Sequence, residues 1–293
     1  MATARLHPTL RGLTWVSPWL LGFGLFMLLP ITLSAWYSLT DYSLLDRPIY
    51  VGLENYRELL HDSVAHAALK NSAIFTLATV GVGTLLSLAL ALLLEQRLPG
   101  SEFVRAIVFL PTLVPVIAAA LLWMWALNTE TGSVNTILRT LHLPTPDWLG
   151  TPTGAMASIV LVSLWGIGTF VVTYAAAIRG VPVSLYEAAC IDGAGPFRRL
   201  TTITLPIISP TIAFNLVMSI IWSLQAFAVP LVMTRGGPAN ATTTFALYVY
   251  QNAFVFGRMG YACALAWVQF LFTLVLVAGV LWASRRAVYH RGA

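Results

Sequence analysis

The stretch Tyr186–Pro206, YEAACIDGAGPFRRLTTITLP, lies between two long apolar runs of the sequence. It contains a glutamate, an aspartate, two arginines and two glycines, although only 9% of the 293 residues in the chain are charged. Soluble domains contain roughly 25% charged residues. Because 58% of this chain is hydrophobic, we predict a polytopic membrane protein, with the polar stretch in a connection between two spans.

Six apolar runs contain no Asp, Glu, Lys, Arg or His, and each is long enough for a membrane-spanning helix. They are Leu13–Tyr37, Ala73–Leu94, Ile107–Leu127, Ala155–Ala177, Ile207–Met233 and Tyr261–Ser284. Prolines and glycines inside these runs are expected to permit kinks and close packing. The composition and the runs therefore predict an all-α fold with six transmembrane helices.

The distribution of basic residues predicts the orientation. If both termini lie on one side, that side holds ten of the sixteen Lys and Arg residues, including Arg198 and Arg199, and has a net charge of +6. The opposite side holds the other six and has a net charge of −1. Since loops with more Lys and Arg stay in the cytoplasm, both termini and the stretch Tyr186–Pro206 are predicted to be cytoplasmic.

The polar stretch is predicted to form two short helices joined by a turn. Ser184 and Glu187 have the spacing of a capping box at the start of the first helix. That helix extends for about two turns, and Gly193 then suits the position after the helix, where a positive φ is common. Pro196 is favoured at the start of the second helix. A capped cytoplasmic connection would explain these features by itself.

The spacing of the whole stretch carries more information. Glu187-Ala188-Ala189, Gly193, Ile203 and Leu205-Pro206 match the pattern E-A-A-x3-G-x9-I-x-L-P at every fixed position. This resembles the signature loop of permease subunits of ATP-binding-cassette (ABC) importers. In that family the loop forms a coupling helix that docks on a separate cytoplasmic ATPase subunit.

The resemblance implies an all-α, six-helix permease of the type I importer class. Its transmembrane domain is expected at residues 13–284, with the coupling loop at 182–206 and cytoplasmic tails at 1–12 and 285–293. The residues expected to couple to the ATPase are Tyr186, Glu187, Ala188, Ala189, Asp192, Gly193 and Arg198. The two alanines would allow close approach, Glu187 would offer a charge, and Gly193 would permit the turn.

Further stretches resemble permeases of the carbohydrate-importing branch. They include VGLENY at Val51–Tyr56, FLPTLVP after Arg105, and TRGGPANAT after the fifth run. That branch takes up sugars, oligosaccharides and glycerol phosphates, so we expect a carbohydrate solute. Import of glycerol 3-phosphate or a glycerophosphodiester by the same machinery remains an alternative.

The resemblance also implies the partners and the place of the energy source. A second permease, two ATPase subunits and an extracytoplasmic solute-binding protein are expected, in a bacterial or archaeal cytoplasmic membrane. The sequence contains no G-x4-G-K-[ST] phosphate-binding loop, and its one lysine is Lys70 on the predicted outer side. The chain is therefore expected not to be an enzyme and to hold no cofactor, with ATP and magnesium bound by the partner ATPase.

A stripe of polar and aromatic residues on the fifth run is the candidate substrate path. Asn215, Ser219, Trp222 and Gln225 recur at helical spacing within an arc roughly 120° wide. Trp165 and Thr169 on the fourth run are candidates for the same path. Polar residues in spans also serve as hydrogen-bonding contacts between helices, so a packing role for Asn215 and Ser219 is equally open.

Two other classes of membrane protein are alternatives. An ion-coupled secondary carrier commonly places carboxylates or histidines inside its spans, and the six runs contain none. A membrane scaffold or receptor that transports nothing is the second alternative.

Overall fold

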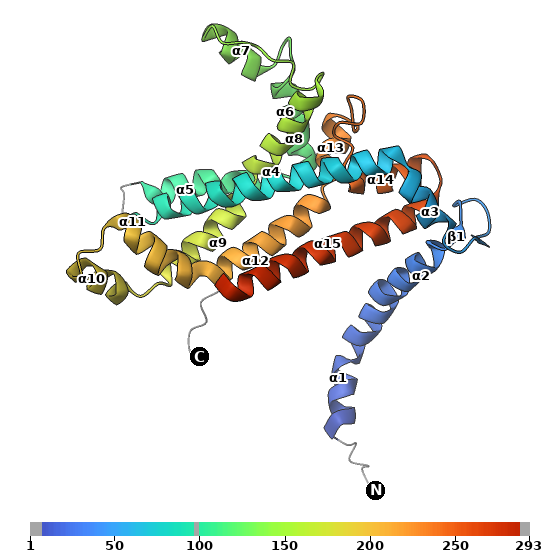
Figure 1. The fold of residues 1–293 in the computed structure, drawn as a ribbon, viewed down its shortest axis with the longest axis horizontal. Coiled ribbons are helices and arrows are strands. Elements are labelled where there is room, and N and C mark those ends of the chain that lie inside the picture. The colour runs from blue at the N-terminus through green and yellow to red at the C-terminus, as the bar shows by residue number, and fades with distance from the viewer. Residues whose placement is uncertain (1–7, 97–99, 288–293) are drawn as a thin grey trace. The chain divides into compact units, whose positions relative to one another are not determined.

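The structure is a computed structural model that describes residues 8–96 and 100–287 (Figure 1). Its contacts divide the chain into two compact units. One unit consists of Met1–His61 with Val249–Val268, and the other consists of Asp62–Tyr248 with Gln269–Ala293. The predicted tails at 1–12 and 285–293 lie partly outside the described residues, as does Arg97 from the charge count. The predicted boundaries of the transmembrane domain stay a prediction.

The first unit contains one helical segment near the N-terminus, a small hairpin and a short amphipathic helix. Its elements are α1 (Pro8–Phe23), η1 (Gly24–Leu28), α2 (Leu29–Tyr37), β1 (Thr40–Asp41), β2 (Ile49–Tyr50), α3 (Glu54–His61) and η4 (Gln251–Val255). The first ten residues of α15 (Met259–Ala287) also belong to it. β1 and β2 pair in antiparallel register, with Thr40 opposite Tyr50.

The second unit contains the remaining helices. They are α4 (Ser63–Leu94), α5 (Ser101–Phe109), η2 (Leu110–Leu113), α6 (Val116–Ala126), α7 (Ser133–Thr140), α8 (Pro152–Trp165), α9 (Gly168–Arg179), α10 (Val183–Ile191), α11 (Pro196–Arg199), η3 (Leu200–Thr204), α12 (Leu205–Leu224), α13 (Ala228–Met233) and α14 (Phe245–Tyr250). The last two residues of α14 belong to the first unit. The two-residue strands β1 and β2 are the only strands in the described chain, which confirms the all-α prediction.

Within residues 8–96 and 100–287, four helical segments are long and apolar enough to cross a membrane: Trp15–Tyr37, Ser63–Leu94, Pro196–Met233 and Met259–Ser284. Two pairs of helices, each with a bend between its members, are also long and apolar enough when the members are taken together. They are Ser101–Leu113 with Val116–Ala126 and Pro152–Trp165 with Gly168–Arg179. Counting each pair as one span gives the six predicted spans, in the predicted order along the chain.

The bends lie where proline and glycine interrupt the third and fourth runs. The first pair bends by 101° beside Val114, which is extended at φ −78° and ψ 126°. Val114 precedes Pro115, and a residue before proline is sterically biased away from the helical region. The second pair bends by 45° between Trp165 and Gly168. A Cβ on Gly168 would lie 2.5 Å from the carbonyl oxygen of Val108, so glycine permits the close approach of α9 to α5.

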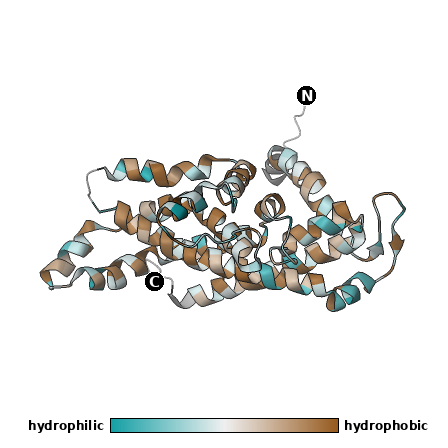
Figure 2. Ribbon diagram, turned by 90° about the horizontal axis from the view of Figure 1, so that it is seen from above, coloured by the Kyte–Doolittle hydropathy of each residue, from teal (hydrophilic) through white to brown (hydrophobic). Residues whose placement is uncertain are grey.

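Helices α4, α9 and α12 pack against one another in the second unit (Figure 1). Near their α10 end the core is formed by buried residues that include Leu94, Val171 and Tyr174. Large apolar side chains such as Leu77 and Leu85 on α4 instead point outward and are more than 70% exposed. Figure 2 shows hydrophobic residues spread along the long helices. This surface suits a bilayer, where apolar side chains need not be buried inside the protein.

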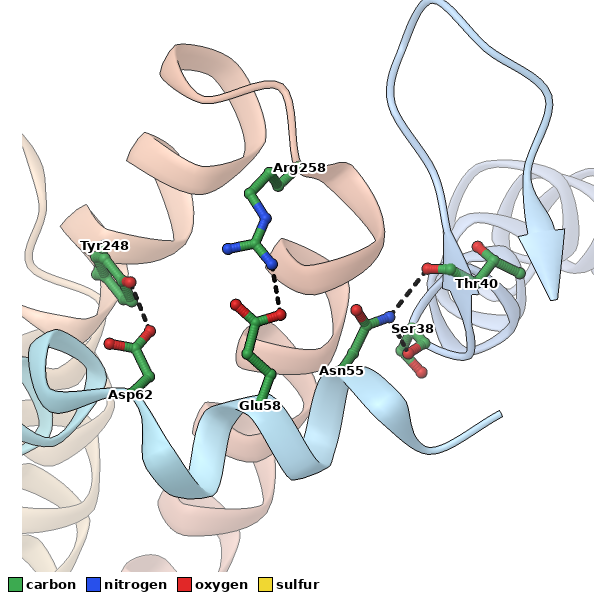
Figure 3. Close-up of polar contacts among 7 residues, drawn as sticks. All are labelled: Ser38, Thr40, Asn55, Glu58, Asp62, Tyr248 and Arg258. Atoms are coloured by element: carbon green, nitrogen blue, oxygen red, sulfur yellow. Dashed lines mark hydrogen bonds and ion pairs between the residues drawn. The ribbon is translucent and has the colours of Figure 1, made fainter. Parts of the chain in front are cut away.

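In the first unit, the VGLENY stretch is hydrogen-bonded to the segment that follows α2 (Figure 3). The buried side chain of Asn55 donates hydrogen bonds to the carbonyl oxygens of Ser38 and Thr40, both at 2.9 Å. Glu58 of α3 forms an ion pair with Arg258. The asparagine and the ion pair therefore fix α3 against other segments of its unit.

In the second unit, Asp62 fixes the first turn of α4 (Figure 3). Its Oδ1 accepts hydrogen bonds from the backbone N–H groups of Val64 and Ala65 at 2.8 and 3.1 Å. Its Oδ2 accepts a hydrogen bond from the hydroxyl of Tyr248 at 2.6 Å. The N-cap of α4 thereby also anchors α14.

Replacement of Asn55 by alanine is expected to lower the free energy of unfolding by about 1–3 kcal/mol, because it leaves two buried carbonyl groups without their donor. The measurement is denaturant-induced unfolding of the purified protein in detergent. Glu54→Ala is the matched control, since its 3.7 Å ion pair with Arg57 is exposed and such pairs contribute roughly 0–1 kcal/mol. Equal stability of the two variants would contradict the role given to Asn55.

Candidate functional site

The predicted coupling loop has the two-helix form expected from its sequence. α10 ends at Ile191, and Gly193 follows in the left-handed region with φ +72°. The N–H of Ala194 bonds to the carbonyl oxygen of Ala189 at 2.8 Å, and the N–H of Gly193 bonds to that of Cys190 at 3.1 Å. This pair of bonds is the Schellman motif, which terminates a helix with glycine at the left-handed position. α11 then begins at Pro196, as predicted.

The predicted capping box is wrong. α10 begins at Val183, and its N-cap is Pro182, with no side-chain hydrogen bond to the cap. Proline has a φ near −65° and cannot cap a helix through its side chain. Because α10 begins at Val183, Ser184 lies inside the first turn. Glu187 is exposed on α10 and is not used to cap the helix.

The exposed surface of the loop includes most of the predicted coupling residues. Glu187, Ala188, Asp192, Gly193 and Arg198 are exposed, whereas Tyr186 and Ala189 are partly buried. The hydroxyl groups of Tyr186 and Thr204 lie 2.8 Å apart and fasten α10 to η3. The structure thus gives Tyr186 an internal contact. The coupling role of all seven residues stays a prediction.

Two large apolar side chains on this loop were missed in the sequence. Ile191 at the end of α10 is 87% exposed, and Phe197 on α11 is 78% exposed. Their apolar character within a polar connection was the available signal. Exposed aliphatic and aromatic groups beside charged ones are typical of a surface that another protein covers.

A cavity of about 210 Å³ lies among α4, the α8–α9 bend and α12. α4 contributes Phe75, Thr79, Thr84 and Ser87, the bend contributes Ser163 and Phe170, and α12 contributes Asn215, Ser219, Trp222 and Ser223. None of the described residues that line it is charged. The walls therefore combine hydroxyl and amide groups with aromatic rings.

The structure brings together three of the six predicted path residues. Asn215, Ser219 and Trp222 line the cavity, and the Trp222 ring packs against Phe170 with centroids 5.5 Å apart. Phe170 and the polar residues of α4 were missed. The spacing of Gly83 and Ser87 on one helical face was a weak signal for that wall.

The other three predicted path residues lie outside the cavity lining. Gln225 is the exposed C-cap residue of α12, because the helix ends one residue earlier, at Leu224. Trp165 packs edge-on against Trp123, with centroids 5.9 Å apart. Thr169 is exposed at the start of helix α9. Their place in the substrate path stays a prediction.

Asn215 places a buried amide at the wall of the cavity, beside the hydroxyl group of Tyr174. Its side chain is 3% exposed, and its Nδ2 atom has no hydrogen-bond partner among the described residues. A buried polar group without a partner costs about 1–3 kcal/mol. Ser219 already donates to the carbonyl oxygen of Leu216 at 3.0 Å. In the described ranges, no group of three or more His, Cys, Asp or Glu residues could hold a metal ion.

Residues 83–288 match the family model described as binding-protein-dependent transport system inner membrane component. The sulfoquinovosyl glycerol transport system permease protein SmoG of Agrobacterium fabrum is 36% identical over 230 residues, which cover 78% of this chain and 75% of that protein. The trehalose/maltose transport system permease protein MalF of Thermococcus litoralis is 35% identical over 251 residues, which cover 85% of each.

A solved structure gives a similar result for the fold. A chain of a bacterial alginate ABC transporter, solved in complex with an alginate pentasaccharide-bound periplasmic protein, superimposes with a TM-score of 0.83. It is 25% identical, and the match covers 93% of both chains. The likeness therefore extends over nearly the whole length of each chain.

Proposed function

Because the chain belongs to the family of binding-protein-dependent transport system inner membrane components, we propose that it forms, with a second permease, the path of a carbohydrate through the cytoplasmic membrane. A solute-binding protein delivers the carbohydrate from outside. A separate ATPase pair docks on the loop 182–206, binds ATP and magnesium, and supplies the energy. Both termini then lie in the cytoplasm. The chain itself acts as a transport subunit rather than as an enzyme.

The lining of the cavity is the observation that carries the choice of solute. Sugars present hydroxyl groups and apolar ring faces, and the cavity is lined by hydroxyl residues, the amide residue Asn215 and the rings of Phe170 and Trp222. Pockets for drug-sized ligands have volumes of about 300–1,000 Å³, so a cavity of about 210 Å³ fits one sugar unit. A larger oligosaccharide would extend toward the second permease.

A neutral carbohydrate fits this chain better than an anionic one. Phosphate and carboxylate groups are commonly held by arginine in bidentate pairs, and the described cavity wall has no charged residue. An anionic glycoside is the second candidate, since relatives include a permease for sulfoquinovosyl glycerol and a transporter of alginate. For such a solute, or for glycerol 3-phosphate, the second permease would have to supply the cation.

Uptake by the full complex in proteoliposomes tests this proposal. The chain is purified with its second permease, its ATPase pair and its binding protein, and uptake of radiolabelled neutral sugars is compared with that of anionic glycosides and glycerol 3-phosphate. We expect uptake of a neutral sugar that requires ATP and the binding protein. Uptake driven by an ion gradient without ATP would instead establish a secondary carrier. A complex whose ATPase no binding protein stimulates would support the scaffold alternative.

A further inference from the structure

A single carboxylate joins three helices at the end of α4 that lies toward the coupling loop. Glu95, the C-cap residue of α4, contacts Arg105 of α5 through Oε1 at 3.0 Å. Its Oε2 contacts Arg179, the last residue of α9, at 2.8 Å. The Glu95 side chain is 15% exposed, compared with 26% for Arg105 and 52% for Arg179. This ionic cluster of Glu95, Arg105 and Arg179 uses both carboxylate oxygens.

The cluster lies next to the coupling loop in the chain. Only Gly180, Val181 and Pro182 separate Arg179 from the first residue of α10. Val181 is buried, so this connection is held by packing. A displacement of α10 therefore acts on the end of α9 that carries Arg179.

The cluster is also close to the cavity wall along α4. Ser87, which lines the cavity, is eight residues before Glu95 on the same axis, a rise of about 12 Å at 1.5 Å per residue. α4 is a continuous helix from Ser63 to Leu94. A force on Glu95 therefore reaches the cavity through one rigid element.

Because Glu95 is mostly buried, the loss of its contacts is costly in free energy. A mostly buried charge that loses its partner is left uncompensated, which is far more costly than the loss of an exposed pair. Since two guanidinium groups share this carboxylate, α4, α5 and α9 are held together at this end. Separation of α9 from α4 would break a charge-assisted contact.

We propose that Glu95 is a positioning residue for energy coupling, which ties α9, at the base of the coupling loop, to α4, so that displacement of α10 moves the wall of the cavity. This inference rests on the proposed function. Arg179 is the contact on the coupling side, and Arg105 holds the carboxylate in place. Glu95 touches neither the solute nor the ATPase in this scheme.

The test uses the full complex in proteoliposomes with the variants Glu95→Gln, Arg179→Gln, Arg179→Lys and the double variant Glu95→Gln/Arg179→Gln. Glu102→Gln is the matched control, because Glu102 is an exposed carboxylate in the first turn of α5. The readouts are solute transported per ATP hydrolysed, ATPase subunit retained on purification, and the thermal midpoint of the complex.

We expect Glu95→Gln to lower the transport per ATP about tenfold, with the ATPase subunit retained and basal hydrolysis within twofold of the unaltered complex. Arg179→Lys should keep most of the coupling. The double variant should be no worse than Glu95→Gln alone, because both changes break the same contact. Unchanged transport per ATP in Glu95→Gln would overturn the proposal. A loss that follows the thermal midpoint or the retained ATPase would also overturn it, because it would show a structural role.

A second readout needs no solute and separates this inference from the proposed function. Spin labels at Val183 on α10 and Leu85 on α4, both exposed, are introduced after the native cysteines are replaced by serine. ATP binding should leave the distance between the labels unchanged in the parent complex and change it in Glu95→Gln. A distance change in both would overturn the proposal whatever solute is carried. Absence of carbohydrate uptake by the parent complex, in contrast, would contradict only the proposed function.

Discussion

Replacement of Gly193 by valine is expected to lower ATP-driven solute uptake at least tenfold, while the transmembrane helices stay folded. Gly193 has φ +72° and ends α10 in a Schellman motif. A residue with a Cβ in this conformation costs roughly 1–2 kcal/mol. No atom of the described chain outside the adjacent residues lies within 4 Å of a Cβ at this position, so the cost arises from the backbone. The turn between α10 and α11 would therefore change direction, and the loop would lose its fit to the ATPase.

The neighbouring glycine provides the control for that substitution. A Cβ on Gly195 also meets no atom within 4 Å, but Gly195 has φ −67° and ψ 168°, a conformation that any residue adopts. We expect Gly195→Ala to transport normally and Gly193→Ala to lose activity in the same direction as the valine. Glu187→Ala should detach the ATPase without backbone strain. Normal transport by both Gly193→Val and Glu187→Ala would remove the coupling role from this loop.

Replacement of Asn215 by leucine is expected to raise the KM for solute uptake at least tenfold without lowering the stability of the protein. The leucine side chain is close to asparagine in shape and removes the unpartnered Nδ2 donor from the buried position. A buried polar group without a hydrogen-bond partner carries a desolvation cost of about 1–3 kcal/mol, and the apolar leucine removes that cost. A lost hydrogen bond to a sugar hydroxyl weakens solute binding, since each 1.4 kcal/mol corresponds to about a factor of ten. Uptake kinetics and the thermal midpoint are measured on the same preparation.

The opposite pattern would assign Asn215 to helix packing. In that case Asn215→Leu would lower the thermal midpoint and leave the KM unchanged, because the amide would be bonding to neighbouring helices. Thr169→Leu and Gln225→Leu separate the cavity from the other predicted path residues. Both residues are exposed and lie outside the lining. A raised KM in either variant would place that residue in the substrate path, as the sequence predicts, and an unchanged KM would exclude it.

The coupling loop could be predicted in detail because its form depends on local chemistry. Glycine after a helix and proline at the start of the next are signals that act within a few residues. The error at Ser184 is also local. Pro182, two residues before it, takes the N-cap position, and the helix begins at Val183, two residues earlier than the capping-box pattern implied.

The cavity was only half predicted, because its walls come from three helices. The helical spacing on α12 identified Asn215, Ser219 and Trp222, which share one face. Gln225 continues the same spacing, but α12 ends before it. The α4 and α9 walls depend on which faces of distant helices meet, and no single periodic pattern contains that information.

The contacts of Glu95 and Asn55 could not be predicted for the same reason. Glu95 and Arg179 are 84 residues apart in sequence, and the sequence gives no sign that they meet. Asn55 lies in the VGLENY stretch that was used for the family resemblance, but its bonds to Ser38 and Thr40 require the fold. Local signals thus predict the elements, while contacts between elements need the structure.

The length of α4 has a thermodynamic consequence for the whole transport cycle. Its 32 residues span about 48 Å, whereas the hydrocarbon layer is about 30 Å thick. Near the start of α4, Asn71 donates hydrogen bonds to the loop before α14, and Ser72 accepts one from the backbone N–H of Phe245. At the other end Glu95 holds Arg105 and Arg179. One rod therefore joins both aqueous faces. If nucleotide binding changes the affinity for the delivery protein by some factor, then by linkage the delivery protein changes the affinity for nucleotide by the same factor.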